Sequence, residues 1–192
     1  MDDTELTARL AGDLDGAFEA LVTAHVDRCH AIALRVLGHP HDAEEVAQDA
    51  LVRAYRALSG YPPERILELR LRPWLATIVV NLCRNRVRRR RVPVTALEPL
   101  LDAGREPAAG EDTDPSALGE RDAVRRQLAT LLDALPDRYR IPVVLRHVDD
   151  LSYPELAEIL GRPEGTLKAQ VHRGLVRLRD AWAARERREE TA

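Results

Sequence analysis

The sequence predicts an all-α protein with two small helical domains and an acidic segment between them. Its length of 192 residues fits one ordinary domain or two small ones. Only 4% of the residues are aromatic, so the core must be built mainly from Leu, Val, Ile and Ala, which favours helices over a β-sandwich or barrel. In both halves of the chain, apolar residues recur at spacings of three, four or seven, as they do on a helix with one buried face.

Composition also excludes several classes of protein. No apolar run approaches the ~18 residues of a membrane-spanning helix, and the polar start, MDDTEL, is not a signal peptide. Two cysteines, Cys29 and Cys83, cannot form the disulfide framework of a secreted scaffold of this size. We therefore expect a protein of the reducing cytoplasm with no membrane insertion.

Helices are expected on both sides of a break in the first domain. Helical periodicity begins near the start of the chain and is interrupted at residues 38–40, which read Gly-His-Pro. Asp42, with Glu45 three residues later, resembles a capping box and predicts the start of the second helix. That helix is expected to end at Leu58, because Ser-Gly-Tyr-Pro-Pro follows it.

The first domain continues with a loop and a basic helix. The loop, residues 59–72, has some helical character, and Pro73 is well placed as the first residue of the helix that follows. This helix ends in the arginine-rich run Arg84–Arg91. Four consecutive arginines point around a helix and cannot all be neutralised within one small domain, so we expect contacts with nucleic-acid phosphates.

Charge is strongly segregated along the chain, although the net charge is only −3. Six arginines and no acid lie between residues 81 and 92, whereas eight acids and two arginines lie between residues 98 and 122. Surfaces separated in this way serve different functions. Residues 92–120 also contain four prolines and three glycines and lack sustained periodicity. We interpret them as a linker between domains at 1–91 and 121–192.

A helix-turn-helix is predicted in the second domain. A short helix at residues 153–160 is followed by a turn at Gly161–Pro163 and by a longer helix from Glu164 to about Arg179. Apolar residues of the two helices are expected to pack together: Leu156, Ile159, Leu160, Leu167, Val171, Leu175 and Leu178. Five cations and one acid lie between residues 162 and 179, so the second helix presents a basic face suited to the major groove of DNA.

Four segments in this order resemble the bacterial RNA polymerase sigma factors, and among them the small two-domain extracytoplasmic-function (ECF) group. The segments are LAGDLDGAFEALVTAH, HDAEEVAQDALVRAYRAL, RPWLATIVVNLCRNRVRRRR and the stretch from LDALPDRYR to GLVRLR. The resemblance covers nearly the whole chain. It implies a protein that binds core RNA polymerase and directs promoter-specific initiation by reading the −35 and −10 elements and opening the −10 DNA. No catalytic residue, metal or cofactor is implied.

The resemblance also assigns contacts to numbered residues. Contacts with core polymerase are expected from Asp42, Glu44, Glu45, Asp49 and Arg53. Contacts with −10 DNA are expected from Trp74, Asn81, Arg84, Asn85, Arg88 and Arg89. Contacts with −35 DNA are expected from Arg162, Glu164, Thr166, Lys168, His172, Arg173 and Arg177. The implied partners are the clamp helices and flap of RNA polymerase, promoter DNA and an anti-sigma factor.

Asn81 is the residue with the most specific implied role. The resemblance places it in a pocket that holds a base flipped out of the non-template strand, with Asn85 and the loop 59–72 completing the wall. Its amide offers a donor and an acceptor that can read a base edge. The alternative is an ordinary solvent-facing helix residue. Trp74 lies seven residues earlier, on the same side of the helix, and we interpret it as core rather than as a stacking platform.

The chain departs from the family pattern at three places. Ala169 and Gln170 stand where Ser and Arg are common, so the −35 sequence that is read need not be the usual one of the family, whereas docking on the −35 element is still expected. The loop 59–72 is several residues longer than usual, so the −10 specificity need not follow that of the family. Pro142 falls inside an expected helix, where it removes one backbone hydrogen bond and should kink the helix.

Two other functional classes remain open. A metal enzyme would use His39, His41, Asp42 and Glu45, or the pair His25 and Cys29. The first set spans a loop and a helix cap, and the second lacks the further Cys or His that would close a tetrahedral site. A stand-alone helix-turn-helix regulator would bind duplex operator DNA tightly without polymerase. A sigma factor would need core polymerase, so run-off transcription distinguishes the two.

Overall fold

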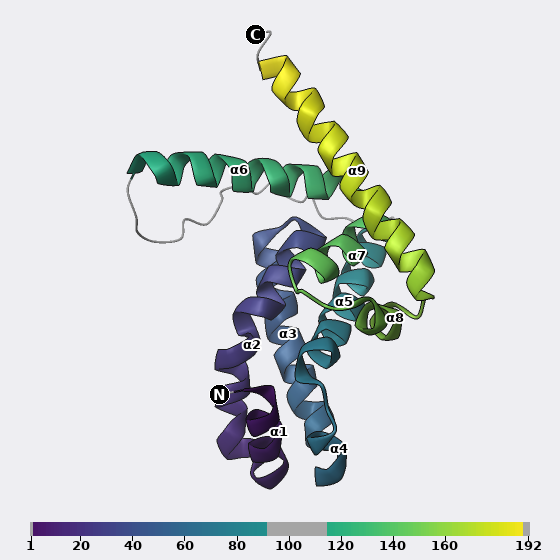
Figure 1. Cartoon of the computed structure of the whole chain (residues 1–192). Coiled ribbons are helices and arrows are strands. Elements are labelled where there is room, and N and C mark those ends of the chain that lie inside the picture. Colours follow the sequence, from purple (N-terminus) through teal and green to yellow (C-terminus); the bar gives the residue numbers. More distant parts are fainter. Residues whose placement is uncertain (1, 92–114, 190–192) are drawn as a thin grey trace, which may run out of the picture.

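The computed structural model describes residues 2–91 and 115–189 of the chain, and within these ranges the secondary structure is helical, without strands. Figure 1 shows two groups of helices, α1–α5 in purple to teal and α6–α9 in green to yellow. The all-α, two-domain prediction is confirmed. Residues 92–114, most of the expected linker, lie outside the described residues, and helix α6 begins at Pro115, before the expected linker ends.

The first domain is built around the long helix α2. Its helices are α1 (Asp3–Gly12), α2 (Leu14–Leu37), α3 (Pro40–Leu58), α4 (Pro63–Leu67) and α5 (Leu71–Arg91). The Asp13 carboxylate caps α2 by accepting a hydrogen bond from the Gly16 amide at 3.0 Å. Gly38 ends α2 in the left-handed conformation, with φ of 71°, which suits glycine because it lacks a Cβ.

Two predicted helix starts are wrong. Helix α3 begins at Pro40, its N-cap His39 makes no side-chain capping bond, and the Asp42 and Glu45 carboxylates bind the Arg86 side chain instead of capping the helix. Helix α5 begins at Leu71 rather than at Pro73. Pro73 still lies in the first turn, where its missing N–H has no intrahelical partner to lose.

The second domain contains the predicted helix-turn-helix. Its helices are α6 (Pro115–Ala134), α7 (Asp137–His147), α8 (Tyr153–Leu160) and α9 (Glu164–Glu189). Ser152 and Glu155 form a capping box at the start of α8, and Gly161 ends this helix with φ of 62°. Helix α9 continues to Glu189 rather than ending near Arg179. Leu175 is 40% exposed and does not join the packing that we predicted for it.

Helices α7 and α9 approach each other closely at Gly174. A Cβ at this position would lie 2.6 Å from Cγ2 of Val143, and Tyr139 lies just beyond. Only a residue without a side chain fits this contact. Pro142 is accommodated inside α7 and is buried at the same level of the helix. The close contact with α9 and the burial of α7 hold this helix together around its proline.

The two domains share one hydrophobic core. Helices α2 and α5 of the first domain contact α7 and α8 of the second. Buried residues from both domains form one continuous cluster that includes Ile32, Val36, Cys83, Leu145, Leu151 and Leu156. Burial raises the pKa of Cys29 to about 11 and that of Cys83 to about 12, so both thiols stay protonated near neutral pH. We call this contact between the domains the closed arrangement.

A polar clasp lies beside the shared core. The carboxylate of Asp149, in the segment between α7 and α8, pairs with Arg28 of α2, and its side chain is only 1% exposed. Its backbone carbonyl accepts hydrogen bonds from Arg28 at 2.5 Å and from Arg72 at 3.1 Å. A second ion pair joins Arg70 to Glu155 at the start of α8. Every bond in this clasp crosses from one domain to the other.

Asp149 makes the stability of the fold depend on pH. Burial raises its pKa from 3.8 to about 6, and Arg28 offsets only part of this rise. Between about pH 4 and pH 6 the folded chain therefore holds a proton that the unfolded chain has released. The contribution of Asp149 to the free energy of unfolding falls as the pH rises through this window, and it is constant above it.

We predict that Asp149→Asn removes this dependence. In the wild-type chain, the free energy of unfolding should lose about 2–3 kcal/mol through this group between pH 4 and pH 7, and the variant should lack that loss. Urea unfolding measured at several pH values tests the prediction. Asp180→Asn is the matched control, because Asp180 is exposed on α9 and is not among the groups that shift the pKa of Asp149. Equal pH profiles for wild type and Asp149→Asn would contradict the assignment.

Candidate nucleic-acid and polymerase interfaces

Asn81 lies on the side of helix α5 that is turned away from the core. Its neighbours Val80, Leu82 and Cys83 are all buried, whereas Asn81 is exposed and has no hydrogen-bond partner among the described residues. One turn further on, the Asn85 side-chain oxygen accepts a bond from Arg88 at 3.1 Å. The free amide of Asn81 is therefore available to another molecule.

Trp74 lies near the start of α5, two turns before Asn81. Its ring is half-buried and contacts both hydrophobic clusters of the molecule, and it lies 6.4 Å from the ring of Tyr61 in the loop before α4. Arg65 of α4 stacks over the same Tyr61 ring at 3.8 Å. Trp74 thus links the loop to α5, in agreement with the interpretation of Trp74 as core.

The arginines at the end of α5 have different surroundings. Arg88 and Arg89 are exposed and Arg84 is half-buried. The side chains of Arg90 and Arg91 lie outside what the structure describes. Arg86 points back into the domain, so it does not belong to the free basic surface that the sequence predicted for the whole run.

Arg86 connects α5 to α3. It donates hydrogen bonds to the Asp42 carboxylate at 3.0 and 2.7 Å and also binds Glu45. The hydrogen bond and the charge of Arg86 lower the pKa of Glu45. The helix expected to meet polymerase is thereby tied to the helix expected to meet −10 DNA. A tertiary contact across 44 residues leaves no local mark in the sequence, so sequence reasoning missed it.

The residues expected to contact polymerase therefore fall into two groups. Asp42 is 9% exposed and Glu45 is half-exposed, and both are bound to Arg86. Glu44, Asp49 and Arg53 are exposed on α3. Sequence reasoning also missed Val52, which is 48% exposed on the same helix. An apolar side chain amid charged neighbours is the composition expected at the centre of a protein–protein contact.

We predict that Arg86→Gln loosens the connection between α3 and α5. Removing a charge-assisted, two-pronged hydrogen bond should lower the free energy of unfolding by about 1–2 kcal/mol and return the pKa of Glu45 toward its usual range. Urea unfolding and carboxylate titration by NMR measure the two effects. Arg88→Gln removes the same charge from an exposed site on the same helix and should leave both quantities unchanged. A loss of stability in both variants would contradict the role of Arg86.

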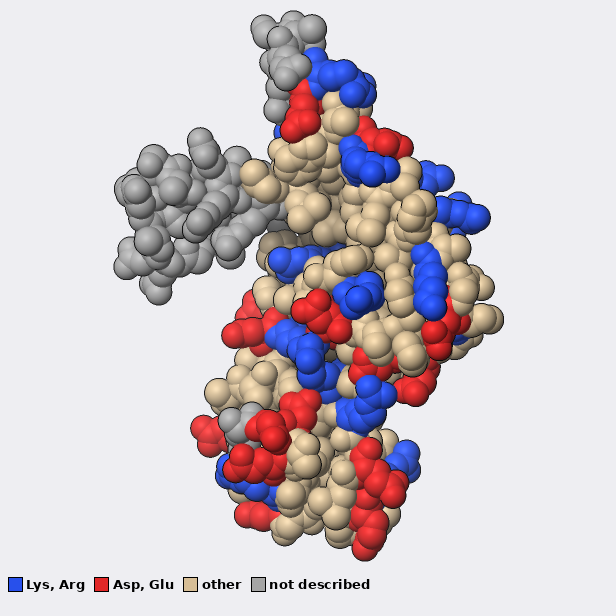
Figure 2. All heavy atoms as spheres, in the orientation of Figure 1, with Lys and Arg blue, Asp and Glu red and all other residues tan. Residues whose placement is uncertain are grey.

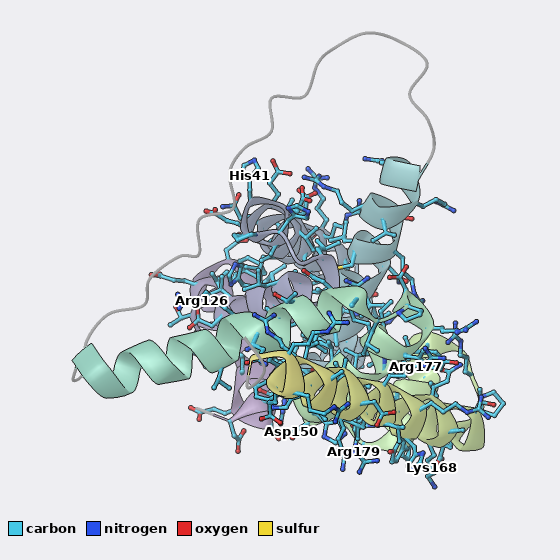
Figure 3. The ribbon with its side chains drawn as sticks, turned by 90° about the horizontal axis from the view of Figure 1, so that it is seen from above. His41, Arg126, Asp150, Lys168, Arg177 and Arg179 are labelled. Atoms are coloured by element: carbon cyan, nitrogen blue, oxygen red, sulfur yellow. The ribbon has the colours of Figure 1, made fainter. Side chains whose placement is uncertain are left out.

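The second helix of the helix-turn-helix carries the residues expected to read −35 DNA. Exposed positions on α9 include Glu164, Thr166, Lys168, His172, Arg173 and Arg177. Figure 3 shows Lys168, Arg177 and Arg179 projecting from this helix, and on the face in Figure 2 cationic side chains gather over α9. Lys168 lies 3.7 Å from Glu164 and 5.5 Å from the Tyr153 ring, and Arg177 lies 5.2 Å from the Tyr139 ring. Arg162 is half-buried and bonds to Gln170 at 3.1 Å.

The candidate metal ligands are arranged differently from a metal site. Asp42 and Glu45 are bound to Arg86, and His25 is buried 3.5 Å from Asp3. Burial is the main cause that lowers the pKa of His25. Within residues 2–91 and 115–189, no three His, Cys, Asp or Glu side chains gather as metal ligands would. In those same ranges, no helix has the length and apolar character needed to span a bilayer.

Comparison with known proteins identifies the family of this chain. Residues 21–92 match the family model for Sigma-70 region 2, and residues 125–178 match that for Sigma-70 region 4. The chain is 33% identical to the ECF RNA polymerase sigma factor SigW of Bacillus subtilis, over 88% of this chain and 89% of that protein. The chain belongs to the ECF RNA polymerase sigma factors. It is an alternative sigma factor that directs promoter-specific transcription.

Two further proteins extend the comparison. This sigma factor is 36% identical to SigE of Mycolicibacterium smegmatis over 87% of its own length, and it spans 62% of that longer protein. Its fold is shared with the sigma factor RpoE of Bartonella quintana, solved in complex with the anti-sigma factor NepR. The TM-score is 0.63 at 22% identity, over 85% of this chain and 94% of that one.

Proposed function

We propose that three helices of this sigma factor each contact a different partner during initiation. Helix α3 binds the clamp helices of core polymerase through Glu44, Asp49 and Arg53, with Val52 at the centre of the contact. Helix α5 engages the −10 element and α9 reads the −35 element, with the second domain also resting on the polymerase flap. Exposure of these charged and polar side chains on three separate helix surfaces supports the division.

The observation that carries this proposal is the free amide of Asn81. Extruding a base from the duplex costs a few kcal/mol, which a fitted pocket can return as binding energy. Asn81 is exposed on a helix whose other side is packed into the core, so the backbone that carries the amide is held in place. Asn85, one turn further along α5, and the loop 59–72, whose Tyr61 ring lies beside Trp74, complete the wall of the pocket.

Reading both promoter elements requires the closed arrangement to open. The elements lie about 25 base pairs apart, which is ~85 Å of duplex at ~3.4 Å per base pair. Arg84 of the −10 surface and Arg162 of the −35 surface line the same cavity of about 420 Å³. Two residues that share one small cavity cannot contact sites so far apart. Opening of the closed arrangement is therefore a step in promoter recognition.

Partners and location follow from the same proposal. The sigma factor works in the cytoplasm, on the nucleoid, because that is where polymerase and promoters are. It makes and breaks no covalent bond and needs no cofactor. An anti-sigma factor is a further expected partner, since the Bartonella quintana structure holds its sigma factor together with one. The stand-alone regulator is not favoured, because both family models belong to sigma factors.

We predict that Asn81→Ala impairs promoter opening and spares polymerase binding. Loss of contacts to one base costs about 1–3 kcal/mol, so open complexes should fall about tenfold to a hundredfold. Permanganate footprinting and run-off transcription with core polymerase measure opening, and fluorescence anisotropy measures core binding. Thr23→Ala, an exposed change on α2, is the control. Equal losses of opening and of core binding would contradict the assignment, as would promoter-specific binding of the chain without polymerase.

A further inference from the structure

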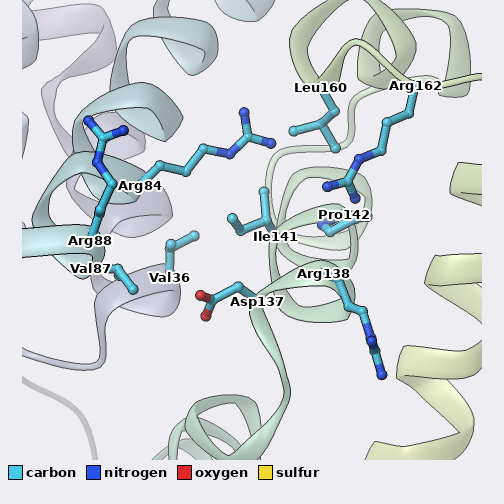
Figure 4. Close-up of a pocket in the computed structure, with 10 residues that line it drawn as sticks. All are labelled: Val36, Arg84, Val87, Arg88, Asp137, Arg138, Ile141, Pro142, Leu160 and Arg162. Carbon is cyan, nitrogen blue, oxygen red and sulfur yellow. The ribbon is translucent and has the colours of Figure 1, made fainter. Parts of the chain in front are cut away.

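The junction between the domains contains a cavity of about 420 Å³ whose walls come from both domains (Figure 4). Helices α2 and α5 form one wall, and α7 with the turn after α8 forms the other. Five apolar side chains line it: Val36, Val87, Ile141, Pro142 and Leu160. The volume lies in the range of roughly 300–1,000 Å³ that is typical of small-molecule sites. Such sites occur frequently at domain interfaces.

Positive charge converges on this apolar cavity. In Figure 4 the Arg84 side chain extends from α5 toward Leu160, and Arg162 reaches toward Pro142 from the other side. Arg88 and Arg138 stand at the margin. Among the lining residues that the structure describes, Asp137 is the one acid, and its carboxylate already accepts a bond from Arg140 at 2.7 Å.

Arg84 and Arg162 are not neutralised by the protein around them. Neither forms an ion pair with any acid in the described part of the chain, and the bond from Arg162 goes to the neutral Gln170. Burial, and then the charge of Arg162, lower the pKa of Arg84. Two like charges that face each other in a half-enclosed space disfavour the closed arrangement unless an anion lies between them.

The chemistry of the cavity selects the class of anion. Guanidinium groups bind phosphate through two parallel hydrogen bonds, so two of them suit a phosphate or diphosphate group. The apolar lining, with Pro142 and Ile141 beside Arg162, suits a flat body such as a nucleobase. An inorganic ion alone would leave this apolar surface in water.

We propose that the junction cavity binds a nucleoside diphosphate or a similar phosphorylated small molecule, with the phosphates between Arg84 and Arg162 and the apolar body against Ile141 and Pro142. Because its walls come from both domains, the site exists only in the closed arrangement. A ligand bound there selects that arrangement. It also occupies two arginines that we assign to promoter DNA, so it opposes initiation.

Calorimetric titration of the full chain, without polymerase or DNA, tests the site directly. The probes are ADP, adenosine and inorganic pyrophosphate. ADP should bind more tightly than either fragment, because only ADP engages both the arginines and the apolar lining. Arg84→Gln and Arg162→Gln should each weaken ADP binding about tenfold or more, as expected for loss of a charge-assisted hydrogen bond. Arg179→Gln, an exposed change on α9, should leave binding unchanged.

Several results would overturn the proposal. These are equal binding of ADP and adenosine, unchanged binding in both arginine variants, or an Arg84 and Arg162 dependence for single-stranded DNA but not for ADP. Binding of ADP only after the acids of residues 92–114 are replaced by amides would show that the chain itself neutralises the arginines. Thermal unfolding checks that each variant is folded. Because no polymerase is present, the result is independent of the proposed promoter function.

A structural readout tests the link to the closed arrangement. Fluorophores placed on the exposed Thr23 of α2 and the exposed Lys168 of α9 report the distance between the domains. ADP should shift this distance distribution toward the closed value in the wild-type chain, and Arg84→Gln should abolish the shift. Tight binding of ADP without any change in the distribution or in thermal stability would contradict the coupling.

Discussion

The buried contact of Asp149 with Arg28 determines how the rest of the molecule is arranged. It joins α2 to the segment between α7 and α8, and the shared core lies directly beside it. Together with the shared core and the Arg70–Glu155 ion pair, this contact holds α5 and the turn before α9 as the two walls of one cavity. The relative positions of the surfaces assigned to −10 and −35 DNA thus depend on this ion pair and on the core beside it.

An ion pair at this position fixes how the two domains face each other more than it strengthens their contact. Removing two charges from water offsets much of their attraction, so a buried pair adds little net stability. It does disfavour other arrangements of the domains, because they would leave a buried charge without its partner. Around it, side chains of α2, α5, α7 and α8 belong to the shared hydrophobic core. This combination suits an interface that must hold one geometry and still open, whereas a fully apolar interface of equal size would resist opening.

The sequence was sufficient for elements that are specified locally. Helical periodicity, the glycine at the end of α8 and the basic face of α9 depend on residues three to seven positions apart, and each was predicted. The errors involve distant partners. Asp42 and Glu45 have the spacing of a capping box, but Arg86 competes successfully for both carboxylates. Asp149 carries no local signal because its partner Arg28 lies 121 residues away. Leu175 fits the apolar stripe, yet α7 meets α9 at Gly174 instead.

The closed arrangement places a free-energy cost on every productive encounter. In the proposed mechanism, polymerase and promoter DNA engage the domains when they are apart, so the free energy of opening is subtracted from that of binding. An opening cost of about 3 kcal/mol weakens apparent affinity roughly a hundredfold. The repulsion between Arg84 and Arg162 lowers this cost, and the clasp at Asp149 raises it. In that mechanism, two opposing electrostatic terms at one junction set how readily the domains separate for initiation.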